Sequence, residues 1–250
     1  MNRQILSTSG IPPSFSLASA ADVKPTPPPR GGKLILVRHG RTVLNSLDDS
    51  EKLRGWLDVP LDDQGLKEAE ETARQVAQYP ATAIYCSDLQ RAQQTAAAIA
   101  RATKLPVISV SELRPWNVGS LAGKRVSTIL DELRQLELDP SRSAPDGESF
   151  LQFYDRYSRK LKELLKVANR SSGCVVAVTH VRNLLAAPSI LQGGDKTKIR
   201  VRGGAKTGAL VWVRKSGRKW YAGGEDDLRT TAPDISGLVP VTAKWNGSGA

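Results

Sequence analysis

The chain contains two histidines, and each of them directly follows a short apolar run. His39 comes after Leu-Ile-Leu-Val-Arg, and His180 comes after Val-Val-Ala-Val-Thr. A single histidine is more often structural than functional, but both histidines of this chain share the same local pattern. A neutral imidazole presents a lone pair near pH 7, so histidine can act as a nucleophile or a base without a separate activating group.

Two arginines accompany these histidines. Arg38 precedes His39, and Arg91 closely follows a third apolar run that ends at Cys86. In open α/β sheets, ligands bind beyond the carboxyl ends of the strands, so we expect Arg38, Arg91 and both histidines to converge there. Guanidinium and imidazole groups at one place offer donors and positive charge, which suits a phosphoryl group.

The elements that must position these residues follow from hydrophobic periodicity. Short β-branched runs predict strands buried on both faces at residues 34–37, 84–86, 107–110 and 175–178. Helical spacing predicts helices at residues 63–78, 89–103, 150–167 and 181–191. In the first helix, the predicted buried face consists of Leu66, Ala69, Ala73, Val76 and Ala77. A terminal hairpin is expected from residues 207–213 and 219–222. This alternation predicts a three-layer α/β/α sandwich with a mostly parallel sheet.

Composition suggests the domain boundaries. Residues 1–30 hold six of the fifteen prolines, which predicts a disordered tail before a folded domain at 31–222 and a flexible tail at 223–250. No apolar run approaches the roughly 18 residues of a membrane span, so we expect a cytoplasmic protein. Cys86 and Cys174 are accordingly expected to be buried free thiols.

The net charge of +11 is concentrated in residues 195–219, which carry nine lysines and arginines and one aspartate. Alternating cations from Lys196 to Arg202 would share one face of a strand. Such a face could steer an anionic substrate or bind nucleic acid, or it could be a solvated edge strand. No cluster has metal-ligand spacing, so we expect no metal and no cofactor.

Five motifs occur in one order along residues 33–215: LVRHGRTVLN at 36–45, GWLDVPLDDQG at 55–65, SDLQRAQQT at 87–95, PDGES at 145–149, and Thr179-His180. This set resembles the histidine phosphatase (phosphoglycerate mutase-like) superfamily. The resemblance implies that His39 is the nucleophile and forms a phosphohistidine without a metal. It implies that Arg38, Arg91 and His180 hold the phosphoryl oxygens. Additional substrate-binding candidates are Gly40, Asn45 and Thr179.

The chain departs from the family where a glutamate normally acts as the general acid, because Pro115 occupies that position. Asn117 is nearby but has no proton to give at neutral pH. The candidate replacements are Glu112, Asp62 and Glu148; each could instead be a solvated carboxylate or a helix cap. Without an acid, alkyl phosphates become poor substrates, whereas phosphohistidine, acyl phosphates and aryl phosphates suffer less.

Three functions therefore remain open. The leading prediction is a metal-independent phosphatase that acts on a phosphorylated small molecule or a phosphoprotein. A phosphoglycerate mutase-type phosphotransferase would need a bisphosphate site and an acid/base partner that the sequence does not reveal. A non-catalytic module would keep the phosphatase fold and bind a polyanion or nucleic acid through its basic face.

Overall fold

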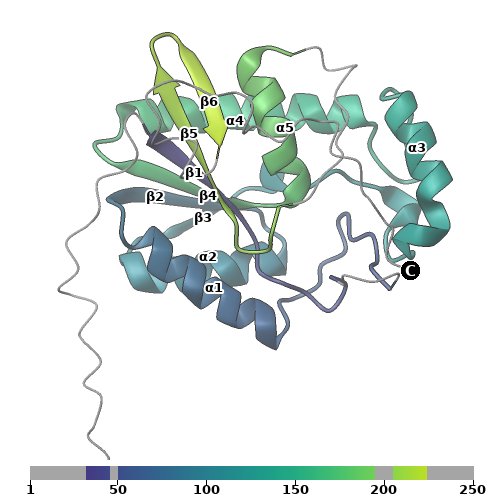
Figure 1. Cartoon of the computed structure of the whole chain (residues 1–250), viewed down its shortest axis with the longest axis horizontal. Coiled ribbons are helices and arrows are strands. Elements are labelled where there is room, and N and C mark those ends of the chain that lie inside the picture. Colours follow the sequence, from purple (N-terminus) through teal and green to yellow (C-terminus); the bar gives the residue numbers. More distant parts are fainter. Residues whose placement is uncertain (1–31, 46–49, 195–204, 224–250) are drawn as a thin grey trace, which may run out of the picture.

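The computed structural model describes residues 32–45, 50–194 and 205–223. Within them, a six-stranded sheet lies between two layers of helices (Figure 1). The strands are β1 (Gly32–Arg38), β2 (Ala81–Cys86), β3 (Val107–Ser109), β4 (Cys174–Thr179), β5 (Leu210–Ser216) and β6 (Lys219–Gly223), in the spatial order β3-β2-β4-β1-β5-β6. The strands β3, β2, β4 and β1 are parallel to one another. Strand β5 pairs antiparallel with β1 on one side and with β6 on the other. The predicted mostly parallel α/β sandwich and its terminal hairpin are confirmed.

The described helices are α1 (Asp63–Val76), α2 (Gln90–Thr103), α3 (Leu130–Leu138), α4 (Phe150–Arg170) and α5 (Val181–Gln192). Four of these five helices match the sequence prediction closely, and the fifth, α3, was not predicted. Asp62 caps α1, and Ser149 forms a capping box with Gln152 at the start of α4. These polar caps satisfy backbone N–H groups that have no partner inside the helix, which is why both helices begin where they do.

Side-chain alternation along the central strands divides the core between the two faces of the sheet. Ile35 and Val37 of β1 face the cluster formed with α1 and α2, whereas Leu34 and Leu36 face the cluster formed with α4 and α5. Both clusters are fully covered by helices, so the central strands are apolar on both faces. Cys86 and Cys174 belong to the first cluster as buried free thiols, as predicted.

Two details of the prediction are wrong. Strand β3 is not buried on both faces, because it is the outermost strand of the sheet and leaves Val107 and Ile108 37% and 43% exposed. In α1, Leu66 is 47% exposed and Ala77 is also exposed. The buried face of this helix instead consists of Gly65, Ala69, Thr72, Ala73 and Val76. Small residues on this face let α1 approach its neighbours closely, and Leu66 falls outside that face.

Residues 111–149 have no periodicity that predicts an element, yet they are ordered. Three short 3₁₀ turns, Ser111–Leu113, Gly119–Leu121 and Val126–Ile129, lead into α3. Apolar side chains of this segment, including Trp116 and Val118 between the first two turns, belong to the buried cluster that contains α4 and the sheet. Tertiary packing, rather than local pattern, therefore shapes this segment.

Several sequence predictions fall outside the described residues: the tail at 1–30, the cationic face at 196–202, and all of the C-terminal tail after Gly223. They stay predictions. Among the described helices, none is both long and apolar enough to cross a membrane.

Candidate active site

The two histidines meet at the carboxyl edge of the sheet. Strands β1 and β4 are parallel neighbours with Arg38 opposite Thr179, and the backbone N–H of His39 donates to the Thr179 carbonyl at 3.1 Å. This register places the residues that follow the two strands side by side, with His39 and His180 ring centroids 5.0 Å apart. Helix α5 begins directly after His180, so its positive N-terminal end also lies at this edge.

His39 is held as a neutral imidazole with one defined tautomer. Its Nδ1 lies 2.7 Å from the Gly40 carbonyl oxygen, and because a carbonyl can only accept, Nδ1 carries the proton. Burial lowers the pKa of His39 well below its ordinary value, and the charges of Arg91 and Arg38 lower it further. The Nε2 lone pair is therefore available at neutral pH, as nucleophilic catalysis requires.

The site contains buried nitrogen atoms without a hydrogen-bond partner in the described part of the chain. They are Nδ1 and Nε2 of His180, Nε of Arg38 and Nε of Arg91. Burial also lowers the pKa of His180 well below its ordinary value, and the charges of Arg91 and His39 lower this pKa further. Buried polar groups in folded proteins are normally bonded. Four such atoms around one place indicate a site built for a ligand rich in acceptor oxygens.

Backbone carbonyls, rather than carboxylates, anchor the two arginines. Nη1 and Nη2 of Arg91 donate to the carbonyls of Leu57 at 2.6 Å and Gly55 at 2.9 Å, and Nη1 of Arg38 donates to the carbonyl of Ala205. Burial, followed by the charge of Arg54, lowers the pKa of Arg91 to about 9 and of Arg38 to about 10. Both remain cationic at neutral pH, and carbonyl anchoring leaves their charge for an anion.

Sequence reasoning missed a third arginine of the site. The positive charge of Arg54 lowers the pKa of Arg38, Arg91 and both histidines. Its Nη1 donates to the Leu44 carbonyl at 3.1 Å, and its Nη2 lies 3.3 Å from Oε1 of Glu51. The sequence feature that could have identified Arg54 as a site residue is its position directly before the Gly55-Trp56 motif.

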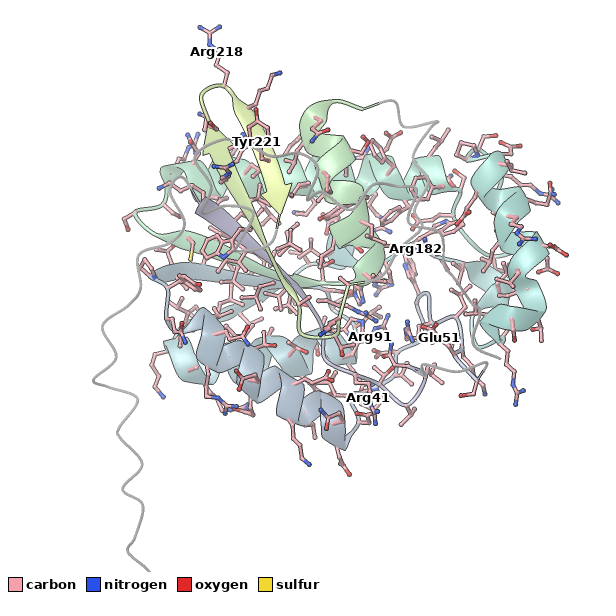
Figure 2. The ribbon with its side chains drawn as sticks, in the orientation of Figure 1. Arg41, Glu51, Arg91, Arg182, Arg218 and Tyr221 are labelled. Carbon is pink, nitrogen blue, oxygen red and sulfur yellow. The ribbon has the colours of Figure 1, made fainter. Side chains whose placement is uncertain are left out.

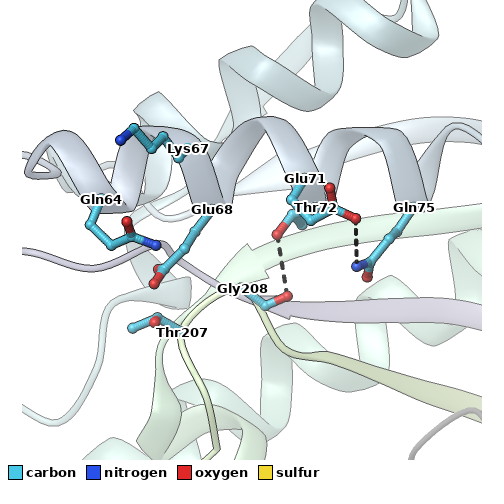
Figure 3. A pocket seen from close by; sticks show the side chains of 8 residues that line it. All are labelled: Gln64, Lys67, Glu68, Glu71, Thr72, Gln75, Thr207 and Gly208. Atoms are coloured by element: carbon cyan, nitrogen blue, oxygen red, sulfur yellow. Dashed lines mark hydrogen bonds between the residues drawn. The ribbon is translucent and has the colours of Figure 1, made fainter.

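A short loop braces the nucleophile from the other side. The backbone N–H of Gly208 lies within 3.1 Å of the Arg38 carbonyl oxygen and 3.3 Å of the His39 carbonyl oxygen, and its own carbonyl accepts from Thr72 Oγ1 at 3.3 Å. This loop and α1 enclose a polar surface groove of about 330 Å³ (Figure 3). The groove lies behind the backbone of the nucleophile, and neither Arg91 nor either histidine lines it. We therefore infer that the loop around Gly208 supports the backbone of the nucleophile and that this groove is not the phosphoryl site.

The three predicted substrate-binding residues have structural partners. A side chain at Gly40 would lie 2.4 Å from the Gly65 carbonyl oxygen, so close packing against the start of α1 requires glycine there. Oδ1 of Asn45 accepts from the backbone N–H and the hydroxyl of Thr42, both at 3.0 Å, which closes the loop after the nucleophile. The Thr179 hydroxyl donates to the Leu113 carbonyl at 2.8 Å and ties β4 to the 3₁₀ turn.

Each of the three candidate acids has a partner other than the two histidines. Asp62 accepts from Gly65 N at 2.8 Å as the cap of α1 and from Nε of Arg41 at 2.9 Å. Glu112 lies 3.6 Å from Nζ of Lys160 on the far side of the 3₁₀ turn.

The third candidate, Glu148, belongs to an ion pair that supports the segment around Pro115. Its Oε1 accepts from Nη2 of Arg156 at 2.6 Å and from the backbone N–H of Asn117 at 3.0 Å. The Pro115 carbonyl accepts from Arg156 at 3.1 Å and from Nε1 of Trp56 at 2.8 Å. Glu148 thus holds the loop that would carry the family's acid.

No group of three or more His, Cys, Asp or Glu side chains with metal-binding geometry occurs within residues 32–45, 50–194 and 205–223. The site residues present a cationic surface instead of carboxylate ligands. Figure 2 shows Arg91, Arg182 and Glu51 gathered in this view near the edge where β1 and β4 end, whereas Arg218 lies at the distant hairpin tip.

Comparisons with known proteins agree with this geometry. The model of the histidine phosphatase superfamily (branch 1) matches residues 34–223. The probable phosphoglycerate mutase GpmB of Proteus mirabilis is 30% identical over 166 residues, which are 64% of this chain and 71% of that protein. The GpmB protein of Yersinia pestis is 31% identical over 150 residues, 58% of this chain and 68% of that protein.

Solved structures with a similar fold have lower sequence identity. A mycobacterial glucosyl-3-phosphoglycerate phosphatase in complex with VO3 superposes with a TM-score of 0.68 at 22% identity, covering 76% of this chain and 97% of that chain. A phosphoglycerate mutase from Bacillus anthracis superposes with a TM-score of 0.64 at 20% identity, covering 78% and 92%. By its family match and its fold, the chain belongs to branch 1 of the histidine phosphatase superfamily.

Proposed function

We propose that this protein is a metal-independent phosphatase that hydrolyses a phosphorylated substrate through a phosphohistidine at His39. The observation that carries the proposal is the buried cluster of two neutral imidazoles and three arginines, with unpartnered nitrogens on His180, Arg38 and Arg91. Such a cluster is complementary to a phosphoryl group, whose oxygens accept hydrogen bonds and carry negative charge.

The reaction proceeds in two steps. Nε2 of His39 attacks phosphorus while the bond to the leaving oxygen breaks, and Nδ1 keeps its proton through the Gly40 carbonyl. Arg38, Arg91 and His180 hold the equatorial oxygens and stabilise the charge that they carry in the transition state. Water then attacks the phosphohistidine, and inorganic phosphate leaves. Positioning and electrostatics supply most of the rate acceleration in this scheme.

This scheme does not yet name the group that protonates the leaving oxygen. Position 115 supplies no proton, and Asp62, Glu112 and Glu148 have other partners. Either the substrate has a leaving group that needs no proton, such as an acyl or aryl phosphate or phosphohistidine, or another carboxyl group supplies it.

The names of similar proteins support both a phosphatase and a mutase. We favour the phosphatase because a mutase must also bind a second phosphoryl group, beyond the one that the cluster of histidines and arginines accepts. The third possibility, a non-catalytic polyanion-binding module, predicts no turnover of any ester. Hydrolysis of p-nitrophenyl phosphate separates it from both enzymes, since that leaving group barely needs an acid.

The decisive experiment is chemical trapping of the intermediate. Acid-labile, alkali-stable label should remain on the chain when turnover of a ³²P-labelled ester is quenched, and His39→Ala should remove it. His180→Ala is the matched control, because it should slow turnover while label still accumulates on His39. Label that persists in His39→Ala would overturn the assignment of the nucleophile.

A further inference from the structure

Glu51 precedes Arg54 in the same loop and contacts this site arginine through its side chain. Its Oε1 is 3.3 Å from Nη2 of Arg54, and 41% of its side chain is exposed. We propose that Glu51 is the general acid that protonates the leaving group, in place of the glutamate that Pro115 has displaced. This proposal rests on the proposed phosphatase function and names a residue for the step that the family's usual position cannot perform.

The backbone around Glu51 is fixed against the segment that leads into α3. The Glu51 carbonyl accepts from the backbone N–H of Val126 at 2.9 Å, and Lys52 forms an antiparallel bridge with Arg125. Leu53 N–H donates to the Lys124 carbonyl at 2.9 Å. These bonds fix the backbone that carries the Glu51 side chain, while the side chain itself reaches solvent.

Comparison with the other nearby carboxylates singles out Glu51. Among the described residues, the charges of Glu51 and Glu68 act on Arg38, and the charge of Asp58 acts on Arg91. Both carboxylate oxygens of Asp58 accept hydrogen bonds from Gln90 at the start of α2, from its backbone N–H at 2.7 Å and from its Nε2 at 3.1 Å. Glu68 accepts from the backbone N–H of Arg41 at 2.8 Å and lines the groove behind the nucleophile. Among the described side-chain contacts of these three carboxylates, only that of Glu51 is with a guanidinium of the site.

Arg54 links the carboxylate to the phosphoryl site. Arg54 contacts Glu51, and its positive charge lowers the pKa of both histidines, of Arg38 and of Arg91. A bound phosphoryl dianion competes for the same guanidinium, which frees the Glu51 carboxyl group from its ion pair. Substrate binding thereby prepares the acid at the moment when it is needed.

With Glu51 as the acid, each proton that moves in the reaction has a donor and an acceptor. As Nε2 of His39 bonds to phosphorus, the P–O bond to the leaving group breaks, and the leaving oxygen takes the proton of the Glu51 carboxyl group. The Glu51 carboxylate then removes a proton from the water that attacks the phosphohistidine. Products are the alcohol and inorganic phosphate, and both His39 and Glu51 return to their initial states.

The test compares substrates that do and do not need an acid. Glu51→Gln should lower kcat for an alkyl ester, glycerol phosphate, by about 10²-fold or more, since general acid catalysis contributes about 10²–10⁴-fold. It should lower kcat for p-nitrophenyl phosphate by less than about tenfold. Glu71→Gln is the matched control, because it removes another i,i+3 glutamate–arginine pair, with Arg74, on the exposed face of α1.

The outcomes are distinguishable. An equal fall for both esters, or no fall for either, would show that Glu51 is not the acid, even though the phosphatase remains. A parent enzyme that hydrolyses p-nitrophenyl phosphate but no alkyl ester would also overturn the inference. If the parent hydrolyses neither ester, the proposed function itself fails. Glu51→Asp, which keeps a carboxyl group, should recover part of the alkyl ester activity.

Discussion

Acidification from about pH 7.5 to about pH 5.5 should destabilise the ligand-free protein by about 2.7 kcal/mol. The chain has two histidines, both are 2% exposed, and burial beside arginines lowers the pKa of each well below its ordinary value. In the unfolded chain they titrate near the ordinary pKa of about 6.5, so between these pH values the unfolded state binds protons that the folded state does not bind.

The sign and the size follow from this difference. A lowered folded-state pKa means that the stability contribution is complete above the unfolded-state pKa and is lost as pH falls below it. Each histidine that stays neutral when folded costs about 1.4 kcal/mol over these two pH units, and the two together cost about 2.7 kcal/mol. For a folded domain of this size, that corresponds to a fall in Tm of about 5–11 °C.

The assay is urea unfolding at several pH values in phosphate-free buffers of constant ionic strength. His180→Gln should halve the pH dependence to about 1.4 kcal/mol, because one of the two titrating groups is gone. Excess phosphate should reduce it in the parent, because a bound anion stabilises a charged imidazole. A parent whose stability changes by less than about 0.5 kcal/mol would refute the claim that both histidines are buried in neutral form.

Two further predictions concern the electrostatics of the site. Hydrolysis should survive excess EDTA, and vanadate should inhibit competitively because it mimics the five-coordinate transition state; loss of activity in EDTA that magnesium or zinc restores would contradict the metal-free mechanism. Arg54→Gln should lower kcat/KM about 10–100-fold, the equivalent of one charge-assisted hydrogen bond of about 1.5–3 kcal/mol. Arg74→Gln, on the exposed face of α1, is its control, and equal kinetics for these two variants would remove Arg54 from the site.

The sequence by itself determined the architecture and the centre of the site. Apolar runs that are buried on both faces have few alternatives to parallel central strands, and the helices between them carry their own caps. Once β1 and β4 are known to be parallel, the residues that follow them must share one edge of the sheet. His39, Arg38 and His180 were therefore predictable from local pattern and topology alone.

Tertiary structure decided the rest, because pattern does not report what a polar side chain contacts. Asp62, Glu112 and Glu148 were equivalent candidates in the sequence, and the structure pairs each of them with a cationic side chain, Arg41, Lys160 and Arg156 respectively. Arg54 and Glu51 gave no periodic signal, since they lie in a loop fixed by backbone bonds to residues 124–126. Residues 111–149 likewise fold through packing against α4 and the sheet. Their arrangement depends on contacts far apart in the chain, which local propensity cannot encode.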